Sequence, residues 1–351
     1  LAALSNAGWT SPVWAQQTPE PALLDSVIVT GRRNAEDPPI VADARQRLSR
    51  TPGAVAVISA ESYADRYATN LADVLRDAPG VYAQKKWGGD IRLSIRGSGI
   101  GNAAHNRGVL LAQDGVPFNE ADGFGDFQLI DPLIARYTEV YKGGNALRFG
   151  GALLGGAVNL VTPTGRTASS NLNLRLDGGS YGTVRAHAEA AGVRGDWDGF
   201  AAVTGQSVDG WRQQSEGKAL NLSGNIGRSF GQDREVRLLV SWGDIHQEIP
   251  GSVSLSDALT NPEATNPANI ALNYQRNMRS LRTTLQTRWR LDDATVFEGA
   301  LYGTWKDLDH PIFQVIDQQS RNYGAFGRFD WQGRIGGMRA DAFYGAWYRQ
   351  G

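Results

Sequence analysis

Over residues 169–351, apolar and polar side chains alternate. In the clearest stretch, Leu281, Leu285 and Trp289 fall on one face of an extended segment, and Arg282 and Arg288 fall on the other. A period of two predicts β-strands. A soluble β-sandwich would not bury such a row of cations in its core, so we expect one face to meet lipid and the other water. This alternation is typical of an outer-membrane β-barrel, and a soluble two-sheet protein is the alternative.

The alternation predicts about nine antiparallel strands. They lie near residues 170–177, 183–191, 199–207, 217–229, 234–245, 274–290, 294–306, 320–331 and 337–349. Short turns at 192–196, 231–233, 291–293 and 333–337 are predicted on the periplasmic side, and connections at 178–182, 209–217, 246–273 and 306–319 on the extracellular side. The aromatic girdle has these candidates: Trp211, Trp242, Trp289, Trp305, Trp331, Tyr344 and Tyr348. An open sheet would leave edges that lipid does not tolerate, so we interpret the 351 residues as a fragment of a closed barrel.

The chain before residue 165 has a different pattern, which predicts a mixed α/β domain over residues 39–165. Strands are predicted at 55–59, 81–83, 91–95 and 109–112, a helix from Ser59 to Tyr67, a short amphipathic helix at 70–77 and a turn at Asp114-Gly115. Residues 139–165 then predict a strand, a glycine-rich turn and a second strand. Repeated glycine within a strand pattern indicates close backbone approach. This segment is therefore expected to pack inside something and to join two domains.

The N-terminal residues predict processing and an isolated strand. Residues 1–15 resemble the end of a secretory signal, with Val13-Trp14-Ala15 as its cleavage site. Residues 16–38 are a Pro-rich linker around one β-branched run: Asp25, Ser26, Val27, Ile28, Val29 and Thr30. That run can be the first strand of the following domain, or it can add an edge strand to another protein.

Composition excludes several classes of protein. The chain has no Cys and a net charge of −1, so neither disulfides nor a nucleic-acid partner are expected. No run of 18 apolar residues predicts a transmembrane helix. No hydrolase motif occurs, and the glycines of residues 97–101 are not followed by the helix of a dinucleotide site. We therefore expect neither an enzyme nor a cofactor. The four His lack metal-ligand spacing, so we expect no metal site.

Several motifs together resemble those of the TonB-dependent outer-membrane receptors. Residues 25–30 are similar to the family's TonB box, and residues 139–165 to the end of its plug domain. Between them, LADVLRDAPGV (71–81), LSIRGSG (93–99) and LAQDGVP (111–117) resemble three plug signatures in the same order. The resemblance implies an α/β plug followed by a transmembrane antiparallel β-barrel of roughly 22 strands, of which this chain would contain the first part. It also implies location in the outer membrane of a Gram-negative bacterium.

The resemblance further implies which residues contact the barrel and the ligand. Arg96 and Lys142 are the expected contacts from plug to barrel, although Lys142-Gly143-Gly144 stands where the family usually has Arg-Gly-Pro, and Lys cannot make a bidentate contact. Three plug loops, at 84–90, 97–108 and 119–127, would form the floor of a ligand site. Their cations, amides and rings suit an anionic chelate, and solvated loop residues are the alternative. The candidates are Lys85, Lys86, Trp87, His105, Asn106, Arg107, Asn119, Asp122 and Phe124.

The implied function is active import of a scarce nutrient, with a ferric siderophore as the favoured substrate. Ligand binding would loosen residues 25–30, the TonB protein would add a strand to them, and force would displace the plug. Expected partners are TonB with its inner-membrane energising complex, the ferric chelate and outer-membrane lipid. The alternatives are a passive porin, a surface adhesin or phage receptor, and import of free metal ion, haem, cobalamin or a glycan.

Overall fold

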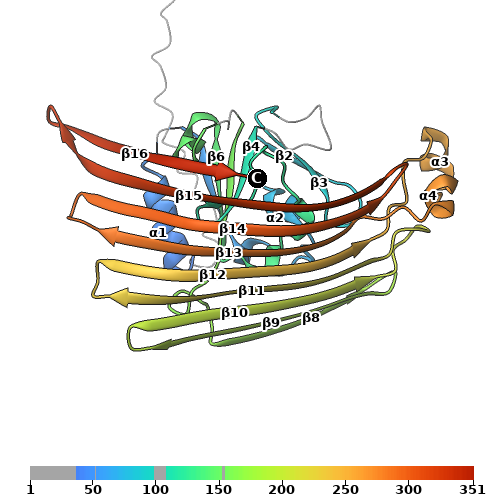
Figure 1. Cartoon of the computed structure of the whole chain (residues 1–351), viewed down its shortest axis with the longest axis horizontal. Helices are drawn as coiled ribbons and strands as arrows, with labels where there is room; N and C mark the ends of the chain where they lie inside the picture. Colours follow the sequence, from blue (N-terminus) through green and yellow to red (C-terminus); the bar gives the residue numbers. More distant parts are fainter. Residues whose placement is uncertain (1–36, 52, 99–107, 152–154) are drawn as a thin grey trace, which may run out of the picture. The chain divides into compact units, whose positions relative to one another are not determined.

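An antiparallel sheet of nine strands forms the second half of the chain (Figure 1). The computed structural model describes residues 37–51, 53–98, 108–151 and 155–351. Each strand of the sheet pairs with its neighbours in sequence, in the order β16 to β8, so the predicted nine-stranded antiparallel sheet is confirmed. The strands are β8 (Leu172–Gly179), β9 (Thr183–Arg194), β10 (Trp197–Val208), β11 (Gly217–Phe230), β12 (Arg234–Gln247), β13 (Asn277–Arg290), β14 (Thr295–Pro311), β15 (Val315–Ile335) and β16 (Met338–Gln350).

The two faces of this sheet differ as the alternation predicts. On β13, Leu285 is 47% exposed, whereas Arg282, on the other face, is 7% exposed. Leu238 pairs with Leu285 across the β12–β13 ladder and is also exposed, as is Leu174 on β8. These leucines are therefore not buried against each other in a soluble core. An apolar outer face over a polar inner face is the pattern of a sheet in contact with lipid.

Aromatic rings form a ladder across four adjacent strands of the sheet. Trp289 on β13 contacts Phe297 on β14 with ring centroids 6.2 Å apart. Phe297 lies 4.9 Å from Phe329 on β15, which stacks on Tyr344 of β16 at 4.9 Å. Such a belt is expected where an apolar surface meets the membrane interface. Trp211, another girdle candidate, lies in the connection between β10 and β11, where the predicted strand boundaries also placed it.

The first half of the described chain is the α/β domain, built on a five-stranded sheet of order β1-β6-β7-β4-β5. All pairs in this sheet are antiparallel except β4 with β7. A separate hairpin pairs β2 with β3. The elements are α1 (Pro39–Leu48), β1 (Val55–Ser59), α2 (Leu71–Leu75), β2 (Val81–Lys85), β3 (Ile91–Ile95), β4 (Val109–Gln113), β5 (Val116–Pro117), β6 (Tyr137–Lys142) and β7 (Gly156–Val161), with short 3-10 helices at Ala60–Ser62, Phe127–Leu129, Pro132–Ile134 and Gly143–Phe149.

Helices cover both faces of the five-stranded sheet. Helix α1 starts with Pro at its first position and buries Val41, Ala44 and Leu48 on one face of the sheet. Helix α2 is capped by the Asn70 side chain and packs on the other face. The sequence pattern predicted α2. It missed α1, because only three of its ten residues are buried and its apolar face is narrow.

Two glycines show why the joint between the domains needs glycine. At Gly156, φ is +142°, and a Cβ atom would lie 2.1 Å from the Tyr141 carbonyl oxygen. At Gly165, a Cβ atom would lie 2.1 Å from the Gly192 carbonyl oxygen, beside the turn between β9 and β10. No side chain fits at these distances. The joint is therefore packed against backbone on both sides.

Two predictions about local structure were wrong. The expected helix from Ser59 to Tyr67 is only a 3-10 turn, because the Ser59 hydroxyl donates to the Glu61 carboxylate and caps no helix. The expected long loop at 306–319 is mostly strand: β14 continues to Pro311 and pairs with the start of β15, from Val315. The two strands therefore form a hairpin with a short turn at residues 312–314, and β13 pairs with β14 as far as Asp309.

The connection from β12 to β13 is the longest in the sheet, as predicted, but it is ordered around two short helices. These are α3 (Leu255–Thr260) and α4 (Pro267–Ala271), capped by Ser254 and Asn266. Arg212, from the preceding connection, donates to carbonyl oxygens of Ala264, Pro250 and Gly251 and so fixes this segment. Among the described residues, no helix combines the length and the apolar character needed to cross a membrane.

Candidate functional site

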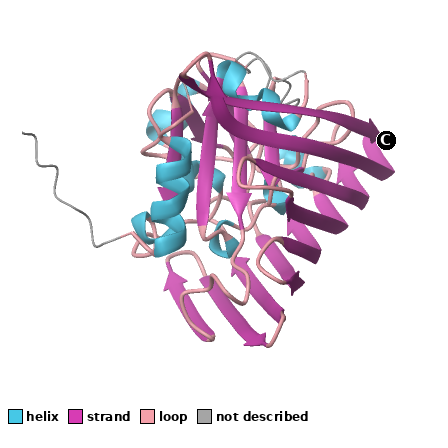
Figure 2. Ribbon diagram, turned by 90° about the vertical axis from the view of Figure 1, so that its left-hand side faces the viewer, coloured by secondary structure: helices cyan, strands magenta, loops and turns pink. Residues whose placement is uncertain are grey.

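The inner face of the nine-stranded sheet lies against the α/β domain (Figures 1 and 2). Inward-facing polar side chains make the contacts. Four arginines from strands β8, β9, β13 and β15 reach backbone carbonyl oxygens of the domain. The pairs are Arg175 to Ala64 at 2.7 Å, Arg185 to Ala68, Arg282 to Val116 at 2.9 Å and Arg328 to Arg148 at 3.2 Å. The α/β domain is therefore fastened to the sheet at several widely separated places.

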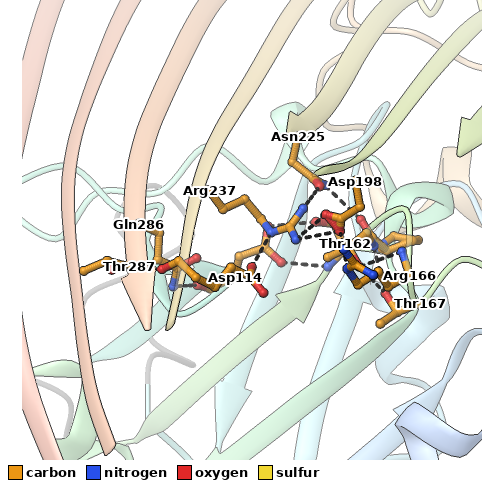
Figure 3. Close-up of polar contacts among 12 residues, drawn as sticks. Asp114, Thr162, Arg166, Thr167, Asp198, Asn225, Arg237, Gln286 and Thr287 are labelled. Atoms are coloured by element: carbon orange, nitrogen blue, oxygen red, sulfur yellow. Dashed lines mark hydrogen bonds and ion pairs between the residues drawn. The ribbon is translucent and has the colours of Figure 1, made fainter. Parts of the chain in front are cut away.

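One polar cluster lies at the junction where the α/β domain continues into the sheet (Figure 3). Arg237 on β12 donates to Asp198 on β10 at 2.7 Å and to Asn225 on β11 at 2.6 Å. Asn225 in turn donates to the carbonyl oxygen of Pro163, in the segment after β7, at 2.8 Å. Arg166 lies 3.9 Å from Asp198. We call the nine-stranded sheet the wall. Its side chains in this cluster, Arg237, Asp198 and Asn225, are all buried, so the cluster joins three strands of the wall to the segment after β7.

The Asp114-Gly115 turn is the next point of contact. Gln286 on β13 donates to the Asp114 carbonyl oxygen at 3.0 Å. The Asp114 carboxylate accepts hydrogen bonds from the backbone N–H and the hydroxyl of Thr162, at 2.8 and 3.0 Å. Burial raises the pKa of Asp114 although these bonds favour its ionised form. The predicted turn is therefore held from both sides.

A third cluster joins the domain's loop at residues 119–127 to the sheet. We call Glu120, Asp126, Arg276 and Lys306 the acid–cation cluster. Lys306 on β14 contacts Asp126 at 2.7 Å and also Glu120, and Arg276, just before β13, contacts Asp126. Both cations also lie over the Phe124 ring, at 5.1 Å for Lys306 and 5.8 Å for Arg276. The loop is thus held by two wall cations through two carboxylates and one ring.

A cavity of ≈ 60 Å³ lies between the α/β domain and strands β11 to β14. Glu120, Asp126 and Lys306 line it together with Arg282 and with hydroxyls such as that of Ser241. Its volume admits a few water molecules. The acid–cation cluster therefore borders a space between the domain and the wall.

The predicted ligand-binding lysines of the first loop are engaged within the α/β domain. Lys85 forms an ion pair with Asp73 at 2.7 Å, and Lys86 with Asp90 at 2.5 Å. Lys86 also lies 5.3 Å from the centre of the Trp87 ring. The charges of these two predicted ligand-site lysines are therefore balanced within the α/β domain. Sequence alone did not show that carboxylates 12 and 4 residues away would pair with them.

Asn119 is a further correction. The residue is 6% exposed, and its side chain accepts a hydrogen bond from the Leu111 N–H at 2.6 Å and donates to the Gly123 carbonyl oxygen at 2.9 Å. It therefore shapes the loop from within. Asp122 accepts from the Phe124 N–H at 2.9 Å in a local turn. Of the remaining predicted site residues, His105, Asn106 and Arg107, as well as Asp25 to Thr30, lie outside the described residues.

The predicted contact of Arg96 and Lys142 with the barrel has no polar counterpart in the part of the chain that the structure describes: there, neither side chain has a hydrogen bond or ion pair to the nine-stranded sheet. The Arg96 guanidinium lies beside Gly143, and burial, with Arg96 nearby, lowers the pKa of Lys142. The wall contacts come instead from inward-facing side chains of the strands. Their alternation in the sequence was the available signal, since Arg282 and Lys306 fall on the polar face of predicted strands.

Comparisons with known proteins agree with this arrangement. Residues 47–157 match the TonB-dependent Receptor Plug Domain. The vitamin B12 transporter BtuB of Vibrio vulnificus is 25% identical over 91% of this chain and 51% of its own length. The ferric enterobactin receptor PirA of Pseudomonas aeruginosa is 31% identical over 38% of this chain and 20% of its own length.

Solved structures show the same fold. The unliganded ferric citrate transporter FecA superposes with a TM-score of 0.72 at 20% identity, over 88% of this chain and 49% of that chain. The siderophore receptor PiuA of Acinetobacter baumannii gives a TM-score of 0.66 at 15% identity, over 85% and 46%. The chain therefore spans about half the length of these solved receptors. Residues 47–157 therefore belong to the plug-domain family of the TonB-dependent receptors, and the chain as a whole, with a plug domain followed by a nine-stranded antiparallel sheet, resembles the first part of such a receptor.

Proposed function

We propose that the protein containing this chain imports a scarce nutrient across the outer membrane, with energy supplied through TonB. The observation that carries the proposal is the position of the plug against the polar inner face of a sheet whose outer face is apolar. A side chain such as Arg282, 7% exposed and bonded to the plug, has its partner inside the barrel. A domain held in this way blocks a passive path, so transport requires the plug to move. The chain acts as a receptor and transporter, without an enzymatic step.

The plug contacts favour active import over the alternatives. A passive porin needs no folded domain fastened at several places on its wall. A surface adhesin or phage receptor can share the barrel, but it gains nothing from a plug. Residues 25–30 would serve as the strand with which a strand of TonB pairs.

The proposed substrate is a ferric siderophore or a similar anionic chelate. The names of relatives support this class, since they include a ferric enterobactin receptor and a rhizobactin receptor. Cobalamin is a second candidate, because the sequence match to the vitamin B12 transporter covers 91% of this chain, whereas that to the ferric enterobactin receptor PirA covers 38%. Haem, free metal ion and glycans are less well supported.

The energy requirement is tested with Ile28→Pro in the full-length receptor, with Ile28→Val as the control. Proline removes the N–H that an added strand needs, whereas valine keeps it. Uptake of radioactive iron, supplied as ferric enterobactin and as ferric citrate, is measured in cells with and without TonB. We expect uptake to be lost with Ile28→Pro and without TonB. Unchanged uptake in either case would refute the proposal.

The substrate is tested separately. Mass spectrometry of the ligand that copurifies with the full-length receptor, followed by growth of a receptor-deficient strain on a panel of iron chelates, identifies the class. Growth on ferric chelates that depends on the receptor is the expected result. Receptor-dependent uptake of cyanocobalamin, without any effect on the use of iron, would favour the second candidate.

A further inference from the structure

The acid–cation cluster is an unusual concentration of charge at the boundary between plug and wall. The Lys306 side chain is 4% exposed and that of Asp126 is 5% exposed, and these two groups lie 2.7 Å apart. Arg276 and Glu120, 14% and 20% exposed at their side chains, complete the set. The two positive and two negative charges balance. Because breaking one side of a buried ion pair leaves a charge without a partner, these groups must move together or exchange partners.

The division of charge between the two parts of the molecule is the second observation. Both cations belong to the wall, and both carboxylates belong to one plug loop. The loop is preorganised, since Asn119 holds its backbone through three hydrogen bonds to Leu111, Val109 and Gly123. It therefore presents two carboxylates and the Phe124 ring to the wall as a unit. Chemically, this is what a small aromatic or carboxylate-bearing chelate would present.

The remaining wall contacts show why this cluster differs from the others. Arg175, Arg185, Arg282 and Arg328 donate to carbonyl oxygens of the plug backbone. Lys306 and Arg276 instead meet plug carboxylates, as a bound anion would meet them. The cluster also borders the ≈ 60 Å³ cavity between plug and wall.

We propose that Lys306 and Arg276 form a recognition site for carboxylate groups of the imported chelate, and that Glu120 and Asp126 occupy this site when the ligand is absent. The inference rests on the proposed function, because it assumes that an anionic chelate enters the barrel. An incoming carboxylate replaces a plug carboxylate, so neither cation is left unpaired at any stage. Exchange releases the loop at 119–127 from the wall and opens the bordering cavity.

Occupation by the plug's own groups lowers the apparent affinity for the chelate, since the ligand must displace an intramolecular competitor. Removing the competing charges with the double variant Glu120→Gln/Asp126→Asn therefore strengthens binding of ferric citrate to the full-length receptor. A charge-assisted hydrogen bond corresponds to about tenfold or more in affinity. Binding of cyanocobalamin, which carries no carboxylate, stays unchanged. Lys306→Met weakens ferric citrate binding by a similar factor.

Loop release is measured with a nitroxide at Ala121→Cys in purified full-length receptor. Residues 1–351 contain no Cys, and Ala121 is an exposed position of the loop whose N–H bonds to Asn322 on β15. We expect the label to gain mobility when ferric citrate is added and to be mobile without ligand in Lys306→Met. Arg279→Gln is the matched control, because Arg279 pairs with Asp244 at an exposed position of β13, the strand next to that of Lys306.

Two outcomes would overturn the inference: no tighter binding of ferric citrate to the Glu120→Gln/Asp126→Asn variant, or an immobile label in Lys306→Met. Neither measurement requires TonB or transport. A receptor that failed to import iron but released the loop with ferric citrate would refute the proposed function and leave this inference standing. A variant too unstable to purify is replaced by Lys306→Gln, which keeps a hydrogen-bond donor and removes only the charge.

Discussion

Loss of the Arg237 guanidinium is predicted to weaken the junction between plug and wall more than loss of any exposed arginine. Arg237→Gln removes the partner of Asp198, whose side chain is 1% exposed and which lies 2.7 Å from the guanidinium. A carboxylate left buried without its partner typically destabilises a protein by about 3–5 kcal/mol. Arg166, at 3.9 Å and 41% exposed at its side chain, compensates in part. We therefore expect about 3 kcal/mol, the lower end of this range.

The assay is urea-induced unfolding of the full-length receptor in detergent, followed by tryptophan fluorescence. The matched control is Arg279→Gln, which makes the same chemical change in an exposed pair with Asp244 and is expected to destabilise by about 1 kcal/mol or less. The double variant Arg237→Gln/Asp198→Asn should be more stable than Arg237→Gln alone, since it removes the buried charge as well. The reasoning is refuted if Arg237→Gln and Arg279→Gln have the same effect, or if the double variant is the least stable of the three.

Three further predictions test the plug, the outer face and the joint. Burial alone would raise the pKa of Asp73, but hydrogen bonds from Lys85 and Thr69 outweigh it and lower the pKa. Lys85→Met should therefore destabilise the receptor by up to about 1 kcal/mol at neutral pH, and the loss should disappear in acid titrations of stability as Asp73 becomes protonated. Leu285→Arg should destabilise it by about 2–4 kcal/mol in lipid bilayers, because the side chain faces the hydrocarbon. Gly165→Ala should abolish or strongly reduce the folded fraction in heat-modifiability gels, because its Cβ would lie 2.1 Å from a carbonyl oxygen.

Matched controls exist for two of these changes. Leu255→Arg places the same charge at an exposed leucine of helix α3, outside the sheet, and should change stability by less than about 0.5 kcal/mol. Gly144→Ala meets no atom within 4 Å and should fold normally. If Leu255→Arg and Leu285→Arg had equal effects, the assignment of the outer face would be contradicted. If Gly144→Ala and Gly165→Ala had equal effects, the packed joint would be contradicted. For Lys85→Met, a destabilisation that persists unchanged in acid would contradict the ion pair with Asp73.

The sequence predicted the architecture because the physical constraints on each half are local and repeated. A lipid-facing strand must alternate, so the period of two located all nine strands of the sheet. Glycine was required where backbones meet, so the pattern around Gly156 and Gly165 indicated a packed joint. Where the constraint was not local, prediction failed. Whether Ser59 caps a helix depends on Glu61, whose carboxylate is held by Arg136 from far along the chain.

The site was predicted less well, because charge pairing depends on contacts that sequence spacing does not show. Lys85 and Lys86 were predicted to contact a ligand, and the structure shows that carboxylates of the same domain pair with both of them. The cations that face the plug from the wall, such as Lys306, were present in the predicted strands. Their position on the polar face of a strand was the only sequence feature that indicated contact with the plug. The candidates predicted in the plug loops did not include them.

The sheet contacts the plug in two chemically different ways, and this difference would let one plug loop respond to a ligand while the plug stays bound to the sheet. Arginines such as Arg175 and Arg328 bind backbone carbonyl oxygens, which carry no net charge and which substitution of plug side chains leaves unchanged. These contacts hold the plug whatever occupies the vestibule. Lys306 and Arg276 bind carboxylates, and a carboxylate can be exchanged for another anion at little net loss of pairing. The wall therefore combines contacts to backbone with contacts between charged side chains, and under our proposal the pairs of Lys306 and Arg276 are the exchangeable contacts that hold the loop at residues 119–127.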